Sequence, residues 1–175
     1  TIDELSRRGT PFIGLLYCGL IVTDNGVRVI EFNARFGDPE TQVVLARLDD
    51  DLAELLHQAA TGELDSAREV RFSDQVALTV VLASEGYPES PVTGRAITGL
   101  DQAEQIEGVS IAHAATAHTD GELIATGGRV LSVVATGDDF AQATQRAYEA
   151  MSLIQLEGSH FRTDIAAKVT DELAS

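Results

Sequence analysis

Three polar side chains alternate along one short stretch of the chain, at Glu31, Asn33 and Arg35. In a strand they would share one face, because successive side chains point to opposite sides of the backbone. The oxygens of a carboxylate and an amide two residues apart can converge on one point. Such ligands suit Mg²⁺, which fills its other positions with water and nucleotide phosphates. Arg35, farther along the same face, could clamp a phosphate or carboxylate oxygen through its planar guanidinium.

The residues after Arg35 add a second feature of the same region. Gly37 permits an unusual backbone turn, and Asp38 followed by Pro39 predicts the start of a helix that runs to about Arg47. The first turn of that helix would aim free N–H groups and a positive dipole end toward the same region. On spacing alone, the alternative stays open that Glu31 and Asn33 line a solvated strand and that Asp38 only caps a helix.

The surrounding pattern predicts the elements that position these residues. Phe12 to Val22 and Val27 to Asn33 should pair as a hairpin around Asp24, Asn25 and Gly26. A helix is expected from Asp51, the last residue of an acidic run, to Ala60. The polar stretch from Glu63 to Asp74 is the expected boundary between a unit of residues 1–66 and a unit of residues 67–175.

The second unit is predicted to be a small mixed α/β domain with an antiparallel sheet, so that the whole chain is α+β. A helix near its start should carry a capping box, with Asp101 and Glu104 as partners, and a final amphipathic helix should begin at Asp138 or Asp139. The strands that we expect in this unit are 75–83, 109–117, 122–125 and 129–135.

Composition excludes several classes of partner. Lys and Arg total 12 against 28 for Asp and Glu, a formal net charge of −16, which disfavours nonspecific binding to nucleic acid or an anionic membrane. The chain has neither an apolar stretch of membrane-spanning length nor a signal-peptide pattern, and its single cysteine, Cys18, is expected to be buried and reduced. We therefore expect a cytoplasmic protein, and a first residue, Thr1, that is not Met suggests a piece of a longer one.

Residues 31–42, Glu-Phe-Asn-Ala-Arg-Phe-Gly-Asp-Pro-Glu-Thr-Gln, resemble the metal-binding strand and following loop of the glycinamide ribonucleotide synthetase family, whose members are ATP-grasp ligases. The run 14–20 resembles the preceding strand, and 127–131 and 161–165 resemble the family's C-terminal domain and tail. The resemblance covers nearly the whole chain. It implies the C-terminal part of an ATP-grasp domain followed by a small C-terminal domain.

The resemblance also implies a reaction and roles for four residues. The parent enzymes join glycine to phosphoribosylamine in purine synthesis, with ATP, through glycyl phosphate. Glu31 and Asn33 match the family's Mg²⁺ or Mn²⁺ ligands, Arg35 would hold the transferring phosphoryl group or the glycine carboxylate, and Asp38 would orient the amine or cap the helix. Because Phe12 to Val22 contains no acid, fewer protein ligands are expected than in related carboxylases.

The nucleotide site is expected to be incomplete. ATP-grasp enzymes hold nucleotide phosphates with lysines upstream of this region, whereas the only lysine here is Lys168. The missing N-terminal part of the enzyme is therefore an expected partner, and the chain alone should be inactive. Two alternatives stay open, namely another ATP-grasp carboxylate–amine ligase or carboxylase and a noncatalytic packing module. Arg129 is either an exposed hairpin residue or faces the active-site cleft from the second unit.

Overall fold

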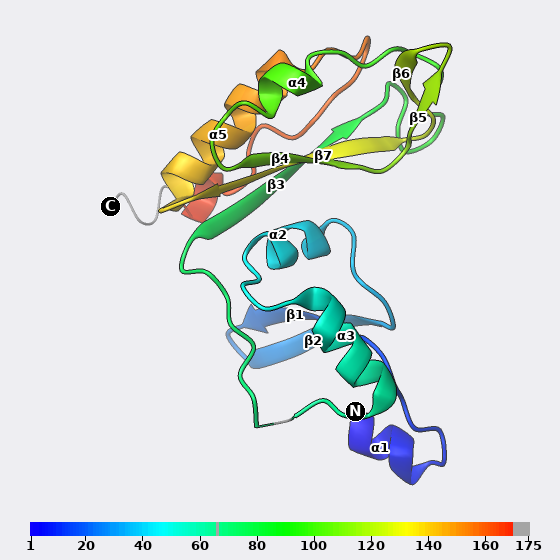
Figure 1. Cartoon of the computed structure of the whole chain (residues 1–175), viewed down its shortest axis with the longest axis vertical. Coiled ribbons are helices and arrows are strands. Elements are labelled where there is room, and N and C mark those ends of the chain that lie inside the picture. The colour runs from blue at the N-terminus through cyan, green and yellow to red at the C-terminus, as the bar shows by residue number, and fades with distance from the viewer. Residues whose placement is uncertain (66, 170–175) are drawn as a thin grey trace. The chain divides into compact units, whose positions relative to one another are not determined.

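The computed structural model describes residues 1–65 and 67–169, which form two compact units. Unit 1 comprises residues 1–41 and 48–72, and unit 2 comprises residues 42–47 and the described residues from 73 onward. Helices and strands are mixed along the chain, and each sheet in the described residues is antiparallel (Figure 1). The expected α+β class is therefore confirmed, while the domain boundary between residues 66 and 67 stays a prediction.

Unit 1 is built on a two-stranded hairpin. Its elements are α1 (Ile2–Arg7), β1 (Tyr17–Thr23), β2 (Gly26–Asn33) and α3 (Leu52–Thr61). The turn forms where expected, since the Thr23 hydroxyl donates to the Gly26 carbonyl at 2.8 Å. The first strand begins at Tyr17 rather than at Phe12, because Tyr17 lies opposite Asn33, the last residue of β2, and pairing ends there.

A β-bulge shifts the hairpin register between Gly19 and Leu20, leaving Ile30 without an opposite residue. Directly opposite residues share a face, so this register defines two faces. The apolar hairpin face carries Cys18, Leu20, Val22, Val27, Val29 and Phe32. The polar hairpin face carries Tyr17, Gly19, Ile21, Arg28, Glu31 and Asn33. Strict alternation would have placed Val27 and Val29 with Glu31, because the side-chain period of a strand is two residues.

The apolar hairpin face lacks a cover in the described residues. Val22 is 81% exposed, Leu20 54% and Phe32 47%. Cys18 is also exposed, contrary to the expected buried thiol. The hairpin therefore presents contiguous apolar surface to solvent.

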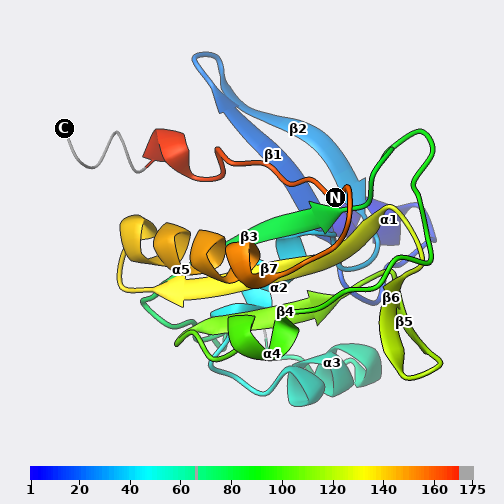
Figure 2. The same ribbon diagram turned by 90° about the horizontal axis from the view of Figure 1, so that it is seen from above.

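Unit 2 has a core of its own. Its strands are β3 (Val76–Ala83), β4 (Val109–His113), β5 (Thr116–Thr119), β6 (Glu122–Ala125) and β7 (Arg129–Gly137). β7 is the middle strand of the sheet β3-β7-β4, and every residue from 130 to 135 is buried. Helix α5 (Phe140–Leu153) packs along one face of this sheet (Figure 2) through buried alanines, which allow close approach to Val80 and Val133.

The segment that joins the two units contributes a helix, α2 (Glu40–Ala46). The Arg47 carbonyl that follows it accepts a hydrogen bond from Ser73 N at 2.7 Å. The Arg47 guanidinium donates to the Ser73 carbonyl at 2.7 and 3.2 Å. These bonds attach residues 42–47 to the chain that leads into β3, which explains why these residues belong to unit 2.

The expected strand from Val109 to Ala117 is two strands in separate sheets. After β4, the Ala114 and Ala115 amides both donate to the Val130 carbonyl at 3.0 Å. The chain then turns away, and Thr116 pairs with Ala125 of β6. The chain contains no Gly or Pro where β4 ends and β5 begins, so the alternation of side chains alone could not predict this break.

The two longest described helices begin with the expected caps. Asp51 caps α3 by accepting from Glu54 N, and Gly62 ends it in the left-handed conformation. Asp139 caps α5 by accepting from Gln142 N. The predicted capping box at Asp101 is wrong, since α4 (Leu100–Ala103) is one turn long and its N-cap residue is Gly99, which provides no side-chain hydrogen bond. Among the described residues, we find no helix with the length and apolar character to cross a membrane.

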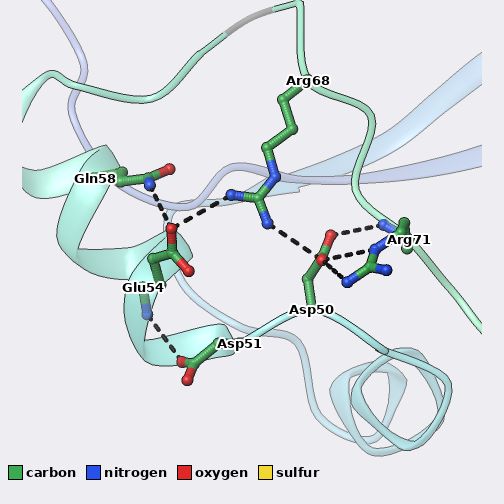
Figure 3. Close-up of polar contacts among 6 residues, drawn as sticks. All are labelled: Asp50, Asp51, Glu54, Gln58, Arg68 and Arg71. Atoms are coloured by element: carbon green, nitrogen blue, oxygen red, sulfur yellow. Dashed lines mark hydrogen bonds and ion pairs between the residues drawn. The ribbon is translucent and has the colours of Figure 1, made fainter.

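Asp50 is the centre of a buried polar network in unit 1 (Figure 3). Its carboxylate accepts from Arg71 N at 2.8 Å and from the Arg71 guanidinium at 2.9 and 3.0 Å. Arg68 lies 3.2 Å away and also contacts Glu54 of α3. The Asp50 side chain is 2% exposed, so the network ties the segment around residues 68–71 to the start of α3. The acidic run 49–51 is expected to cap the helix, and Asp51 does so, whereas Asp50 binds Arg71 and Arg68 instead.

The Asp50 network predicts acid-sensitive stability. The Arg71 amide, the Arg71 guanidinium and Arg68 lower the pKa of Asp50 from 3.8 to about 2. Because the pKa of Asp50 is lower in the folded state, its charged carboxylate stabilises the folded protein at pH values above the unfolded-state pKa. That contribution is lost as pH falls from about 4 toward 2. Asp50→Asn should lower the thermal midpoint of unit 1 at pH 7, measured by circular dichroism. The deficit relative to wild type should shrink at pH 2 to 3.

Asp49→Asn is the matched control, because Asp49 is an exposed carboxylate next in the chain. Equal thermal midpoints for the Asp50→Asn variant and wild type at pH 7 would contradict the assigned role of the network.

Candidate functional site

Glu31 and Asn33 converge on the polar hairpin face, as the sequence predicts. The Asn33 side-chain Nδ2 donates to Glu31 Oε1 at 2.8 Å. Both residues lie near the end of β2, Glu31 exposed and Asn33 half-buried. The two side chains therefore lie together and remain accessible to solvent and to a ligand, and a turn of the Asn33 amide would present its oxygen beside the Glu31 carboxylate to one shared cation.

The opposite strand leaves room for this pair. Gly19 lies across from Glu31, and a β-carbon built on Gly19 would be 3.3 Å from Glu31 Cγ. That separation is tighter than most real contacts of this kind, so a β-carbon at Gly19 would require Glu31 Cγ to shift by a few tenths of an ångström. The absence of a side chain at Gly19 thus leaves room for the Glu31 side chain beside β1.

Tyr17 and Glu40 belong to the same neighbourhood, although sequence reasoning missed both. Tyr17 lies directly across from Asn33. Burial, followed by the negative charges of Glu40 and Glu31, raises the pKa of the Tyr17 phenol. Counting back from the hairpin turn could have found Tyr17, whereas nothing in the sequence pattern points to Glu40.

Arg35 is not placed by strand alternation. β2 ends at Asn33, and the Arg35 Nη1 donates to the carbonyl of the next residue, Phe36, at 2.9 Å. The expectation that Arg35 shares a strand face with Glu31 is therefore wrong for the described conformation. The role of Arg35 toward a phosphoryl group or a carboxylate stays a prediction. Its guanidinium is exposed and makes a hydrogen bond only to a neighbouring carbonyl in the described part of the chain, so its other donors can reach a ligand.

Asp38 and Pro39 lie in a turn before α2, which begins at Glu40, one residue later than expected. Thr41 N donates to the Gly37 carbonyl at 3.3 Å, so one of the first N–H groups already has a partner. Gly37 does not adopt the left-handed backbone conformation, and a β-carbon there would meet only the Glu40 side chain, whose flexible carboxylate end could move away. The role of Asp38 stays a prediction.

The donor set fits a hard cation. Across residues 1–65 and 67–169, no three His, Cys, Asp or Glu side chains group as a metal site. One carboxylate and one amide oxygen leave most positions of a magnesium-like ion for water and for phosphate oxygens. Glu31 and Asn33 therefore suit an ion that is shared with a bound nucleotide rather than held by protein alone.

Two family descriptions match this chain. Residues 77–168 match "Phosphoribosylglycinamide synthetase, C domain". Residues 1–41 match "Phosphoribosylglycinamide synthetase, ATP-grasp (A) domain". The second match includes the hairpin with Glu31 and Asn33, and the first covers more than half of the chain.

Curated relatives resemble the chain over almost all of its length. The phosphoribosylamine–glycine ligase of Leifsonia xyli is 62% identical over 170 residues, which are 96% of this chain and 41% of that protein. The enzyme of the same name from Streptomyces coelicolor is 58% identical, with the same coverage. The chain thus spans about two fifths of the length of these relatives.

Solved structures agree with the fold. The phosphoribosylamine–glycine ligase of Thermotoga maritima has a TM-score of 0.79 and 32% identity, covering 93% of this chain and 39% of that one. The biotin carboxylase subunit of pyruvate carboxylase has a TM-score of 0.60 at 16% identity, covering 91% of this chain and 35% of its own, and supports the fold alone. The expected ATP-grasp portion and C-terminal domain are therefore confirmed as a fold.

The close approach of Gly19 to Glu31 predicts a steric effect on cation binding. Gly19→Val, in a protein extended to the length of its relatives, should weaken Mn²⁺ binding about tenfold, because Glu31 is displaced from Asn33. Titration followed by the electron paramagnetic resonance signal of free Mn²⁺ measures the change. Ile21→Val on the same face of β1 is the control and should bind Mn²⁺ like wild type, whereas wild-type affinity in the Gly19→Val protein would refute the steric argument.

Proposed function

The chain belongs to the phosphoribosylglycinamide synthetase family, and we propose that it is the carboxyl-terminal part of a cytoplasmic phosphoribosylamine–glycine ligase. The enzyme would join glycine to 5-phosphoribosylamine and hydrolyse ATP to ADP and phosphate, in purine synthesis. The identity of 62% with a relative of that name supports the substrates. The structural observation that supports the proposal is the Glu31–Asn33 pair. These side chains are suited to bind the divalent cation that ATP-dependent activation of a carboxylate needs.

The proposed reaction has two steps. The γ-phosphoryl group of ATP passes to the glycine carboxylate to give glycyl phosphate and ADP, and the amine of phosphoribosylamine then displaces phosphate. A Mg²⁺ or Mn²⁺ ion, when bound, offsets phosphate charge during the first step. Glu31 and Asn33 would hold that ion through their side-chain oxygens, because the two side chains lie together and a turn of the Asn33 amide would bring its oxygen to the same side as the Glu31 carboxylate.

Two further residues have proposed roles in orienting substrates. Arg35 would hold the transferring phosphoryl group or the glycine carboxylate, since its planar fork of donors matches either group. Asp38, in the turn before α2, would orient the amine of phosphoribosylamine or cap the helix. Both residues are exposed and lie within five residues of Asn33, which supports their assignment to the same site.

The rest of the enzyme is the proposed partner of unit 1. The chain spans about two fifths of its relatives, and its ATP-grasp match covers only 41 residues. Lys168 is the only lysine, so the amino-terminal part would have to supply lysines for the nucleotide phosphates. The apolar hairpin face offers that part a docking surface, because about half or more of each large aliphatic side chain on it is exposed.

The cation role of Glu31 predicts a specific loss of activity. In the full-length enzyme, Glu31→Gln should lower kcat/KM for ATP by about 100-fold, because an amide replaces the charged ligand that offsets phosphate charge. Coupled detection of ADP in the presence of glycine and phosphoribosylamine measures it. Glu122→Gln, at an exposed acid of β6, is the matched control and should leave the rate unchanged.

An alternative outcome would assign the pair differently. If Glu31→Gln and wild type turned over at the same rate over a range of Mg²⁺ concentrations, Glu31 would be a solvated strand residue and the proposed cation site would be wrong.

The division of the nucleotide site predicts that the isolated chain does not ligate glycine to phosphoribosylamine. Adding the amino-terminal part as a separate polypeptide should restore Mg²⁺-dependent binding of a fluorescent ATP analogue, measured by anisotropy. Val29→Glu should abolish this restoration, because it places a charge on the apolar hairpin face. Leu64→Glu, at an exposed leucine outside that face, is the control. Ligation by the 175-residue chain alone would contradict the proposal.

A further inference from the structure

One cavity of unit 2 is lined by the segment around helix α4, by the end of β4 and by the β5–β6 hairpin. Its volume is about 470 Å³, which lies in the range of sites that hold small organic ligands. The lining residues are at positions 97–102, 104, 113, 118 and 123, all within unit 2. The cavity therefore shares no residue with the proposed cation site at Glu31 and Asn33.

Three short extended segments form one wall of this cavity. His118 of β5 lies opposite Leu123 of β6. On the other side of β6, Ala96 bridges Ile124, and Ile97 N donates to the Leu123 carbonyl at 2.8 Å. Directly opposite residues share a face, so Ile97, Leu123 and His118 line up on one side of these segments. Ile97 is 5% exposed and Leu123 is half-buried, whereas His118 is exposed, so this wall has an apolar floor and a polar rim.

A second histidine is oriented beside this wall. The Nδ1 of His113 lies 3.0 Å from the hydroxyl of Thr116. Thr116 is two residues before His118 on β5, so its side chain lies on the face of His118. In the described part of the chain, the Nε2 of His113 and both ring nitrogens of His118 have no hydrogen-bond partner. Both imidazoles line the cavity and can each hydrogen-bond to a ligand.

Helix α4 adds two carboxylates to the lining. Asp101 and Glu104 are three residues apart in a helical turn, so their β-carbons are about 5 to 6 Å apart on one side of it. Both residues line the cavity and are exposed. Within residues 1–65 and 67–169, neither carboxylate makes a hydrogen bond or an ion pair. Two like charges at this spacing repel each other, and a bound cation would relieve that repulsion.

The backbone holds α4 in this position (Figure 1). Gly99, before the helix, has a φ of 86°, and a β-carbon on it would collide with the Leu153 carbonyl at the end of α5. Thr98 and Gln155 exchange two backbone hydrogen bonds, at 2.9 and 3.0 Å. Leu100 packs against the core of unit 2 and also lines the cavity. The two carboxylates therefore extend from a fixed backbone, which lowers the entropy that binding would cost.

The charge of the lining selects the class of ligand. Among the described lining residues there is neither a lysine nor an arginine, so an anion would meet two carboxylates without a compensating charge. The same part of the chain contains no group of three His, Cys, Asp or Glu side chains that could hold a metal ion. An organic cation fits better, because its charge can pair with the carboxylates while its hydrocarbon part covers the apolar floor.

We propose that this cavity binds a small organic ammonium ion, with its charged end between Asp101 and Glu104 and its hydrocarbon part over Leu123. Hydrogen bonds from an ammonium group to carboxylates are charge-assisted and therefore stronger than neutral ones. His113 and His118 would contact the ligand from the rim. The proposal is independent of the ligase reaction, because no residue of the cavity has a proposed role in that reaction.

A matched pair of probes tests this proposal in the full-length enzyme. Benzylamine and benzyl alcohol share a ring and differ in charge at pH 7. Each is titrated while the imidazole resonances of His113 and His118 are followed by nuclear magnetic resonance. Both resonances should shift, and benzylamine should bind about tenfold more tightly than benzyl alcohol. The double variant Asp101→Asn/Glu104→Gln should lose this preference, because it keeps the shape of the lining and removes its charge.

Glu122→Gln is the control for nonspecific attraction of a cation to this acidic chain. Glu122 precedes Leu123 on β6, so its side chain lies on the other face, and this variant should bind both probes like wild type. Leu123→Ala should weaken binding of both probes to a similar extent, because it removes apolar contact and leaves the carboxylates in place. Equal benzylamine affinity in wild type and in the double variant, or binding that leaves both histidine resonances unshifted, would overturn the proposal.

Discussion

The extra residue at the bulge of the β1–β2 hairpin determines what each face of that hairpin carries. Side chains along a strand repeat every two residues, so without the bulge Val27 and Val29 would lie on the face of Glu31. The register shift after Gly19 moves both valines to the side of Phe32. One face can then bind a hydrated cation while the other is free to be covered by protein. Both the proposed cation site and the proposed docking surface depend on this single irregularity.

The two units differ in how much of their apolar surface they bury by themselves. In unit 2, the sheet around β7 and helix α5 enclose residues such as Leu82, Leu131 and Met151 almost completely. In unit 1, Gly19 is the only buried residue of β1 and β2. Polar interactions such as the hydrogen bonds between Asp50 and Arg71 hold other segments of the unit together. This asymmetry agrees with a chain that spans about two fifths of the length of its relatives.

Local sequence signals predicted the parts of the structure that local physics determines. The hairpin turn, the caps at Asp51 and Asp139 and the convergence of Glu31 with Asn33 all follow from spacings of a few residues. The sequence did not predict features that depend on contacts between residues far apart in the chain. The bulge depends on cross-strand packing, and the partner of Asp50 is 21 residues away. The bridge between Ala83 and His160 joins residues that no short-range pattern relates.

The central claim is that Glu31 and Asn33 hold a divalent ion that is shared with nucleotide. A crystal structure of the full-length enzyme with Mn²⁺ and a non-hydrolysable ATP analogue tests it most directly, because manganese is located by its anomalous scattering. The account predicts one anomalous peak about 2.1 to 2.3 Å from a Glu31 carboxylate oxygen and from Asn33 Oδ1, with phosphate oxygens completing the shell. A peak bound to the phosphates but distant from both side chains would contradict it.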